Sequence, residues 1–231
     1  MDYNAVNAKI QVMKCSLLTK QQYEVLCQSQ SVRHFLSQIR ERATLEEELA
    51  RVRLFLRNTL DRRILSLQGE KDYIRAWPYI KSLPNDTNNR NRQVISCIKG
   101  TEIDLHNIMR IYRLKRYYCN AEVYSHLIPI CYKLNREIIK QMAESHGTAS
   151  LTEVVRHTPY GSISFKNPQQ AISIEMGRVF SKLTKRYPRS MAMVMDYFFA
   201  KSLEERNIIA VREGVKYHLS QRDILDYLRL H

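Results

Sequence analysis

The residues that could take part in catalysis are few, and their spacing does not favour it. Cys131 and His126 could form a nucleophilic thiol–imidazole pair, but a spacing of five residues on a helix or loop gives no facing geometry. His106 and His157 each lack a partner at the spacing typical of metal ligands. The phosphate-binding patterns G-x-x-x-x-G-K-S/T and G-x-G-x-x-G are absent from the sequence. We therefore predict no catalytic residues, no metal and no cofactor.

A basic cluster followed by two aromatic residues is the strongest candidate for a binding surface. It comprises Arg110, Arg113, Lys115, Arg116, Tyr117 and Tyr118. Arginines beside aromatic rings can hold phosphates and stack on bases. A solvated helix face would show the same pattern, so both interpretations stay open. A second basic segment contains Arg212 and Lys216, and we include both residues among the candidates for binding a partner.

The composition indicates a basic protein and predicts that its cysteine thiols are reduced. The 231 residues include 37 Lys and Arg against 23 Asp and Glu, which gives a net charge of +14. This excess favours an acidic partner such as nucleic acid, anionic lipid or an acidic protein surface, although it also serves solubility. The cysteines are odd in number and form no C-x-x-C pair, so we predict neither disulfides nor structural zinc. They are Cys15, Cys27, Cys97, Cys119 and Cys131.

The elements that must position these residues are predicted to be helices, because glycine and proline number only six each and apolar residues recur at helical spacing. The clearest apolar stripe runs from Leu45 to Leu67, behind a capping box at Thr44 and Glu47. Further helix starts are predicted from the pairs Thr19 and Gln22, Ser150 and Glu153, Ser202 and Glu205, Thr101 and Asp104, and Ser220 and Asp223. Loops are expected at 84–92 and 158–168. The start of the sequence lacks the features of a signal peptide, and the longest apolar stretch, 191–200, is too short to span a bilayer.

An internal repeat is predicted from two segments that match at an offset of 100 residues, 102–111 and 202–211. Asp104 corresponds to Glu204, and Asn107 corresponds to Asn207. We expect each acid in a first helical turn, where the helix dipole favours negative charge, and each asparagine in a cap or an inter-helix contact. These four residues are therefore assigned a structural role.

A second pair of similar segments, 18–23 and 134–139, occurs earlier in each half and in the same order. This collinearity predicts two related helical bundles packed side by side, with a first repeat at 1–118 and a second at 119–231. The predicted fold class is all-α.

Three groups of residues resemble the central-stalk rotor coupler of the V-type and A-type rotary ATPases, known as the C subunit or, in eukaryotes, the d subunit. The first spans the opening of the chain and contains Tyr3, Asn7, Ala8, Lys9, Met13, Leu17, Leu18, Tyr23 and Glu24. The second contains Glu102, Asp104, Asn107, Ile111, Arg113 and Lys115. The third contains Glu205, Asn207, Gly214, Lys216, Leu219, Ile224 and Leu228, and in the family a Gly-Lys turn precedes a short last helix at this place.

The resemblance implies a funnel-shaped, all-helical protein without catalytic activity. It also implies a place on the cytoplasmic face of the membrane, attached through a complex. Its partners would be the shaft subunits and the membrane rotor ring, and its role would be to couple the two during ion transport. Members of the family have three helical units, whereas this sequence contains two repeats and so resembles a shortened member. An alternative function is that of a basic helical module that binds nucleic acid, although no recognised nucleic-acid motif supports it.

Overall fold

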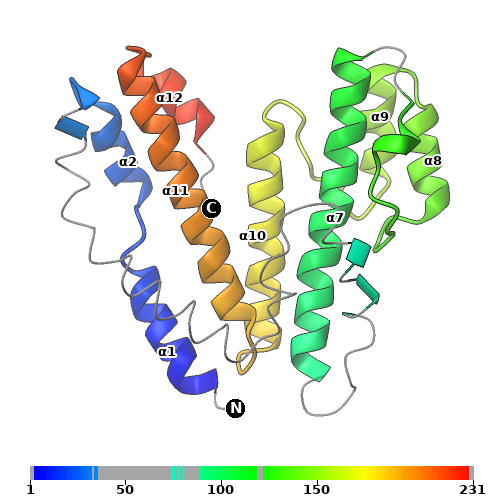
Figure 1. Ribbon diagram of the computed structural model, residues 1–231, viewed down its shortest axis with the longest axis horizontal. Helices are drawn as coiled ribbons and strands as arrows, with labels where there is room; N and C mark the ends of the chain where they lie inside the picture. Colours follow the sequence, from blue (N-terminus) through cyan, green and yellow to red (C-terminus); the bar gives the residue numbers. More distant parts are fainter. Residues whose placement is uncertain are drawn as a thin grey trace. The chain divides into compact units, whose positions relative to one another are not determined.

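The prediction of an all-α protein is confirmed by a computed structural model of the chain (Figure 1). The structure describes residues 3–32, 34–35, 74–75, 77–78, 80, 89–118 and 122–228, and no strand occurs among them. The helices in chain order are α1 (Tyr3–Lys14), α2 (Lys20–Cys27), α7 (Asn89–Tyr117), the 3₁₀ turn η1 (Tyr124–His126), α8 (Arg136–Glu144), α9 (Gly147–Arg156), α10 (Pro168–Arg186), α11 (Ala192–Lys216) and α12 (Gln221–Tyr227).

The described residues belong to two compact units. One unit contains residues 1–67 and 194–231, and the other contains residues 68–193. This division groups residues that pack together in space. The boundary expected at residue 118 instead divides the sequence into two repeats, so the two divisions do not test each other. The repeat boundary, the side-by-side packing and the funnel therefore stay predictions.

Helix α7 is the centre of the unit formed by residues 68–193. Helices α8, α9 and α10 pack against it, and Figure 1 shows α10 on one side of α7 and the α8–α9 pair on the other. The residues that α7 buries recur at three- and four-residue spacing, as expected for one face of a helix. They include Val94, Ile98, Thr101, Leu105, Ile108 and Ile111. At Gly100 a side chain would meet the ring of Tyr132 at 2.3 Å, so only glycine allows this ring to lie against the helix.

The other unit is held together by an apolar cluster between α2, α11 and α12. Its buried members are Tyr23, Leu26, Cys27, Phe35, Val211, Val215, Ile224 and Leu228. Helices α2 and α12 pack against each other, and α1 is joined to α11 by an ion pair between Lys14 and the buried Asp196. Because the pair is partly shielded from water, it fixes the two helices more firmly than a fully exposed pair would.

Two of the predicted helix starts are confirmed. Thr19 accepts the amide N–H of Gln22, whose side chain in turn accepts the amide N–H of Thr19, so α2 begins with a complete capping box. Ser220 likewise accepts the amide N–H of Asp223 at the start of α12.

Three other predicted starts are wrong, because each lies inside a longer helix. Thr101 and Ser202 lie within α7 and α11, and Ser150 lies within α9, which begins three residues earlier. The segments before Thr101 and Ser202 bury apolar residues such as Val94 and Val194, and this burial extends both helices past the local capping pattern.

The expected Gly-Lys turn is also wrong, because Gly214 and Lys216 belong to α11. Gly214 is buried, and a side chain there would meet Ile224 of α12 at 2.5 Å. The turn is instead made by His218, which has a φ of 55°. The amide of Leu219 donates to the Gly214 carbonyl and that of His218 to the Val215 carbonyl, which is the bonding pattern of a Schellman C-cap.

The loop expected at 158–168 is present and leads into α10, which starts at Pro168. The loop expected at 84–92 is wrong for residues 89–92, which form the first turn of α7, and its remaining residues lie outside the described part of the chain. The stripe from Leu45 to Leu67 and its capping box at Thr44 also lie outside the described residues.

Candidate functional site

Asp104 lies in the interior of α7, and not in a first helical turn as expected, and its side chain is fully buried. Its Oδ2 atom accepts the amide N–H groups of Lys133 at 2.8 Å and Leu134 at 3.2 Å, and the hydroxyl of Tyr160 at 2.8 Å. Oδ1 accepts the amide N–H of Tyr132 at 3.3 Å. One carboxylate therefore joins α7 to the segment before α8 and to the loop after α9.

The electrostatics of this group follow from burial. Removal from water raises the pKa of Asp104 above its ordinary value, and the hydrogen bonds from Lys133, Tyr160, Leu134 and Tyr132 only partly oppose that effect. Burial, reinforced by the negative charge and the hydrogen bond of Asp104, also raises the pKa of Tyr160 above its usual range. The Tyr160 hydroxyl therefore keeps its proton and acts as a donor.

Asn107 joins α7 to a non-helical segment that follows η1, which is neither of the two contacts expected for it. Its side-chain amide donates to the carbonyl of Ile128 at 3.0 Å, and its carbonyl accepts the amide N–H of Ile128 at 2.9 Å. Three residues further along α7, the guanidinium of Arg110 donates to the carbonyl of His126 at 2.7 Å. Asp104, Asn107 and Arg110 recur every three residues, so one face of α7 holds the backbone of residues 126–134.

Glu204 and Asn207 occupy the corresponding places on α11, and both are buried. Glu204 is also in the helix interior instead of a first turn. It accepts the amide N–H of Leu18 at 2.7 Å and forms an ion pair with Lys201. Asn207 also lines a groove of about 330 Å³ between α11 and α12, with Tyr217 and Tyr227 among the exposed residues at its edge.

The two acids make the same contact in the two units. Leu134 is followed by Asn135, the N-cap of α8, and Leu18 is followed by Thr19, the N-cap of α2. Each leucine amide donates to the acid of a long helix. The equivalence of Asp104 with Glu204 could be predicted from the sequence, but the contacts themselves could not. In both cases the partners lie on opposite sides of residue 118.

Lys115, a predicted binding residue, caps a helix. Its ammonium donates to the carbonyl of Ala143 at 2.8 Å and to the carbonyl of Ser145 at 2.5 Å, at the C-terminal end of α8. A positive charge is favourable at this end of a helix, and the two bonds satisfy carbonyls that have no partner within the helix. Burial lowers the pKa of Lys115.

Arg113 and Arg116 are exposed near the end of α7. Arg116 donates to the hydroxyl of Tyr112 at 2.7 Å and lies over the ring of Tyr117 at 5.4 Å. Tyr117 and Tyr118 are also exposed, so the basic and aromatic side chains do meet at one surface.

The second basic segment lies near the end of α11. Arg212 and Lys216 both pair with Glu213, and Lys216 also lies over the ring of Tyr217 at 5.1 Å. The structure therefore brings Arg212 and Lys216 together around one carboxylate, on a different unit from Arg113 and Arg116.

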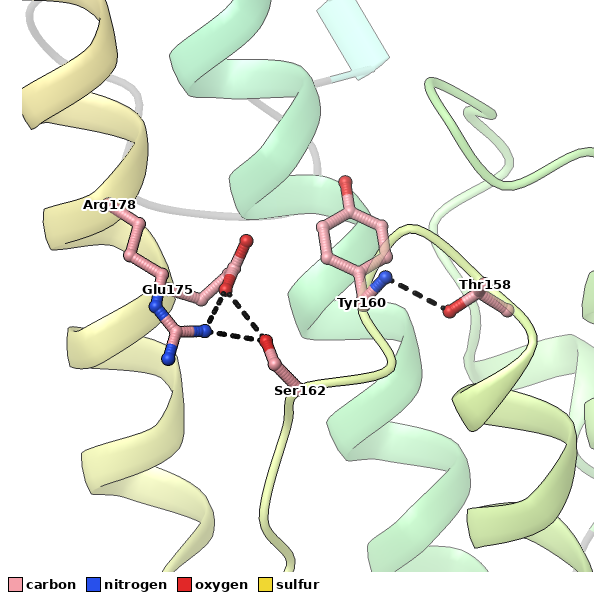
Figure 2. Close-up of polar contacts among 5 residues, drawn as sticks. All are labelled: Thr158, Tyr160, Ser162, Glu175 and Arg178. Atoms are coloured by element: carbon pink, nitrogen blue, oxygen red, sulfur yellow. Dashed lines mark hydrogen bonds and ion pairs between the residues drawn. The ribbon is translucent and has the colours of Figure 1, made fainter.

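The loop between α9 and α10 contains residues that the sequence did not single out. Figure 2 shows Arg178 of α10 turned toward Ser162, with the carboxylate of Glu175 in contact with both side chains. Arg178 donates to the Ser162 hydroxyl at 2.5 Å and pairs with Glu175 at 3.1 Å. On the other side of the loop, Phe165 stacks on Tyr112 of α7 with ring centroids 4.7 Å apart.

These contacts are of the kind that fix a framework, since buried acids and amides bind backbone groups of the same chain. Within the part of the chain that is described, no cluster of three or more His, Cys, Asp or Glu could hold a metal ion. Of the helices with described positions, none combines the length and apolar character needed to cross a bilayer. The fold and its polar contacts define an all-helical protein with exposed basic surfaces.

A comparison with protein families identifies the family to which this chain belongs. The model of the family described as "ATP synthase (C/AC39) subunit" matches residues 56–227, most of the 231-residue chain. The chain belongs to this family of V/A-type ATPase subunits, which confirms the resemblance found in the sequence. Comparisons with curated proteins and with solved structures give no match.

Proposed function

We propose that this protein is a non-catalytic subunit of a V-type or A-type rotary ATPase that couples the central shaft to the membrane rotor ring during ion transport. The observation that carries the proposal is the family match over residues 56–227. The place of action is then the cytoplasmic face of the membrane, where the protein is held peripherally through its complex.

The framework of the two units supports this mechanical role. A part that transmits torque must resist bending, and helix α7, with 29 residues, extends over about 44 Å. The bonds of Asp104, Asn107 and Lys115 tie neighbouring segments to the second half of this helix and brace it there. Buried and satisfied polar networks of this kind rigidify a fold.

The exposed basic residues supply candidate contacts to a partner. Arg110 and Lys115 direct their hydrogen bonds to backbone carbonyls of the same unit, so they serve the framework first. Arg113 and Arg116 on one unit and Lys216 on the other are exposed, and we assign them to the binding of acidic surfaces on shaft or ring subunits. Such rim charges influence association rate and specificity more than affinity.

The test is a native pull-down of the full chain from membranes of its source, with mild detergent and without nucleotide. We expect shaft and ring subunits of a rotary ATPase to be recovered with it. The matched variant R113Q/R116Q/K216Q should recover less of them, whereas R136Q/K140Q/K166Q, which removes the same charge from other exposed positions, should recover the same amount as the unmodified chain. Recovery of no ATPase subunit by the unmodified chain would overturn the proposal.

A salt titration with random-sequence oligonucleotides distinguishes the alternative of a nucleic-acid-binding module. That alternative predicts binding near physiological salt, with an affinity that falls steeply as salt rises. The rotary-ATPase proposal predicts no such binding.

A further inference from the structure

A group of cations gathers at one end of the unit formed by residues 68–193. We define this basic tip as the exposed side chains Arg90, Lys182, Lys185, Arg186 and Arg189. The first belongs to the first turn of α7, and the others belong to the last two turns of α10 or follow them directly. In Figure 1 these are the lower ends of both helices.

Two hydrogen bonds hold the parts of the tip together. The hydroxyl of Tyr187, which follows α10, donates to the side chain of Gln93 at 2.6 Å. The amide of Met191 donates to the side chain of Asn91 at 3.0 Å. The cations of the two helices are therefore parts of one surface, although about ninety residues separate them in the sequence.

Acids are sparse around the tip in the sequence. Residues 87–101 and 176–195 contain neither Asp nor Glu, and the acids that flank these stretches are Asp86, Glu102, Glu175 and Asp196. Within the described part of the chain, no ion pair neutralises Lys182, Lys185, Arg186 or Arg189, whereas Arg178, one turn earlier on α10, pairs with Glu175. Lys185 and Arg186 can also be explained by the favourable effect of positive charge in the last turn of a helix. That effect does not explain Lys182, Arg189 or Arg90.

We propose that the basic tip docks directly onto the anionic lipid headgroups of a membrane. A cluster of four to eight Lys and Arg residues on a helix is typical of binding to anionic lipids, and each long side chain can adjust to a fluid surface. The contact goes beyond the proposed function, because there the protein reaches the membrane only through its complex.

The composition of the tip favours lipid over the other polyanions. Apolar residues near it, Phe180, Leu183 and Met191, are buried, so the tip lacks the apolar anchor that a protein partner would need at the centre of an interface. Of the described aromatic residues near it, Phe180 is buried, and Tyr187 is half-buried and carries Arg186 over its ring at 5.5 Å, so neither ring is free to stack on bases. What remains is charge alone, which matches a continuous anionic surface.

Co-sedimentation of the isolated full chain with lipid vesicles tests this proposal. The chain should bind vesicles of phosphatidylcholine mixed with phosphatidylserine and not vesicles of phosphatidylcholine alone, and added salt should weaken the binding. Each cation at an anionic surface contributes about a fivefold change in partitioning, so removing four predicts a fall of roughly 600-fold. The variant is K182Q/K185Q/R186Q/R189Q.

A control variant removes the same charge from exposed positions elsewhere, R136Q/K140Q/K166Q/R222Q, and should lose far less binding. The variant K182R/K185R keeps the charge and should bind vesicles as the unmodified chain does. Circular dichroism checks the folding of each variant, and K182R/K185R still tests the role of charge if the fourfold variant folds poorly. Equal losses in the tip and control variants, or no binding to anionic vesicles by the unmodified chain, would overturn the proposal. Binding to oligonucleotides or polyglutamate in place of vesicles would overturn it too. The vesicle experiment contains no other ATPase subunit. Its failure would therefore leave the proposed function, which the pull-down tests, unaffected.

Discussion

Replacing Asp104 by alanine removes the acceptor that joins three segments to α7, and its effect on stability can be worked out from the contacts. The substitution removes the acceptor used by the amide of Leu134 and by the hydroxyl of Tyr160, and both residues are almost completely buried. An unsatisfied buried donor costs about 1–3 kcal/mol, which gives about 2–6 kcal/mol for the pair. Because burial disfavours the charge of Asp104 itself, part of this cost is offset. We expect the free energy of unfolding to fall by about 3 kcal/mol.

The isosteric substitution Asp104→Asn is the matched control. One oxygen of Asp104 accepts three of the four hydrogen bonds, so an amide oxygen at the same place keeps them. The contact to Tyr132, the longest at 3.3 Å, is lost, and the amide nitrogen that replaces Oδ1 is a buried donor that faces another donor. This variant should therefore lose about 1–2 kcal/mol, less than D104A. Urea unfolding followed by circular dichroism measures the free energy of unfolding of both variants. We assign about 1–3 kcal/mol to each buried donor that loses its acceptor. This assignment would be refuted if D104A lay within about 0.5 kcal/mol of the unmodified chain, or if D104N were as destabilised as D104A.

The same pair of proteins tests the pKa of Asp104. Burial raises this pKa in the folded state, so the folded chain binds a proton more readily than the unfolded chain. The stability of the unmodified chain relative to D104N should therefore rise as the pH falls from neutral through the raised pKa. The gain is complete below the unfolded pKa of about 4 and disappears again as the pH returns to neutral. A relative stability that falls on acidification over that range would contradict the assigned direction.

Four further predictions concern other parts of the framework. Gly100→Ala should destabilise by about 1–3 kcal/mol, because its methyl group would overlap the ring of Tyr132, and a loss below 0.5 kcal/mol in urea unfolding would argue against that contact. His218→Gly should stabilise by about 1 kcal/mol in the same assay, since glycine adopts a φ of 55° without strain. Glu204→Ala should destabilise by about 2 kcal/mol, more than the exposed-site average, and a neutral result would contradict its role. Burial raises the pKa of Cys27 to about 11, so its thiol should resist iodoacetamide at neutral pH until the chain is unfolded, as measured by mass spectrometry.

The all-helical fold could be predicted because its signals are local. Few glycines and prolines and apolar residues at helical spacing favour helices wherever they occur, and the caps at Thr19 and Ser220 depend only on residues three positions away. The starts expected at Thr101 and Ser202 failed because a capping pattern does not reveal whether the preceding turn is already helical. Burial of the preceding apolar residues decided that question in favour of longer helices.

The candidate site was predictable in its members but not in its contacts. The alignment of 102–111 with 202–211 selected Asp104 and Glu204, yet their partners, Leu134 and Leu18, come from segments remote in sequence. Tyr160 gave no signal at all, since nothing near it in the sequence indicates a bond to an acid 56 residues away. Lys115 was singled out for its charge, and only the position of α8 reveals that it caps a helix.

The central claim, that this chain couples a shaft to a membrane rotor ring, is tested most directly by ATP-driven ion uptake into membrane vesicles of the source organism. Vesicles depleted of the chain should lose ion uptake while ATP hydrolysis by the soluble part of the complex continues, and adding back the purified chain should restore uptake. Depleted vesicles that take up ions at the original rate would contradict the account.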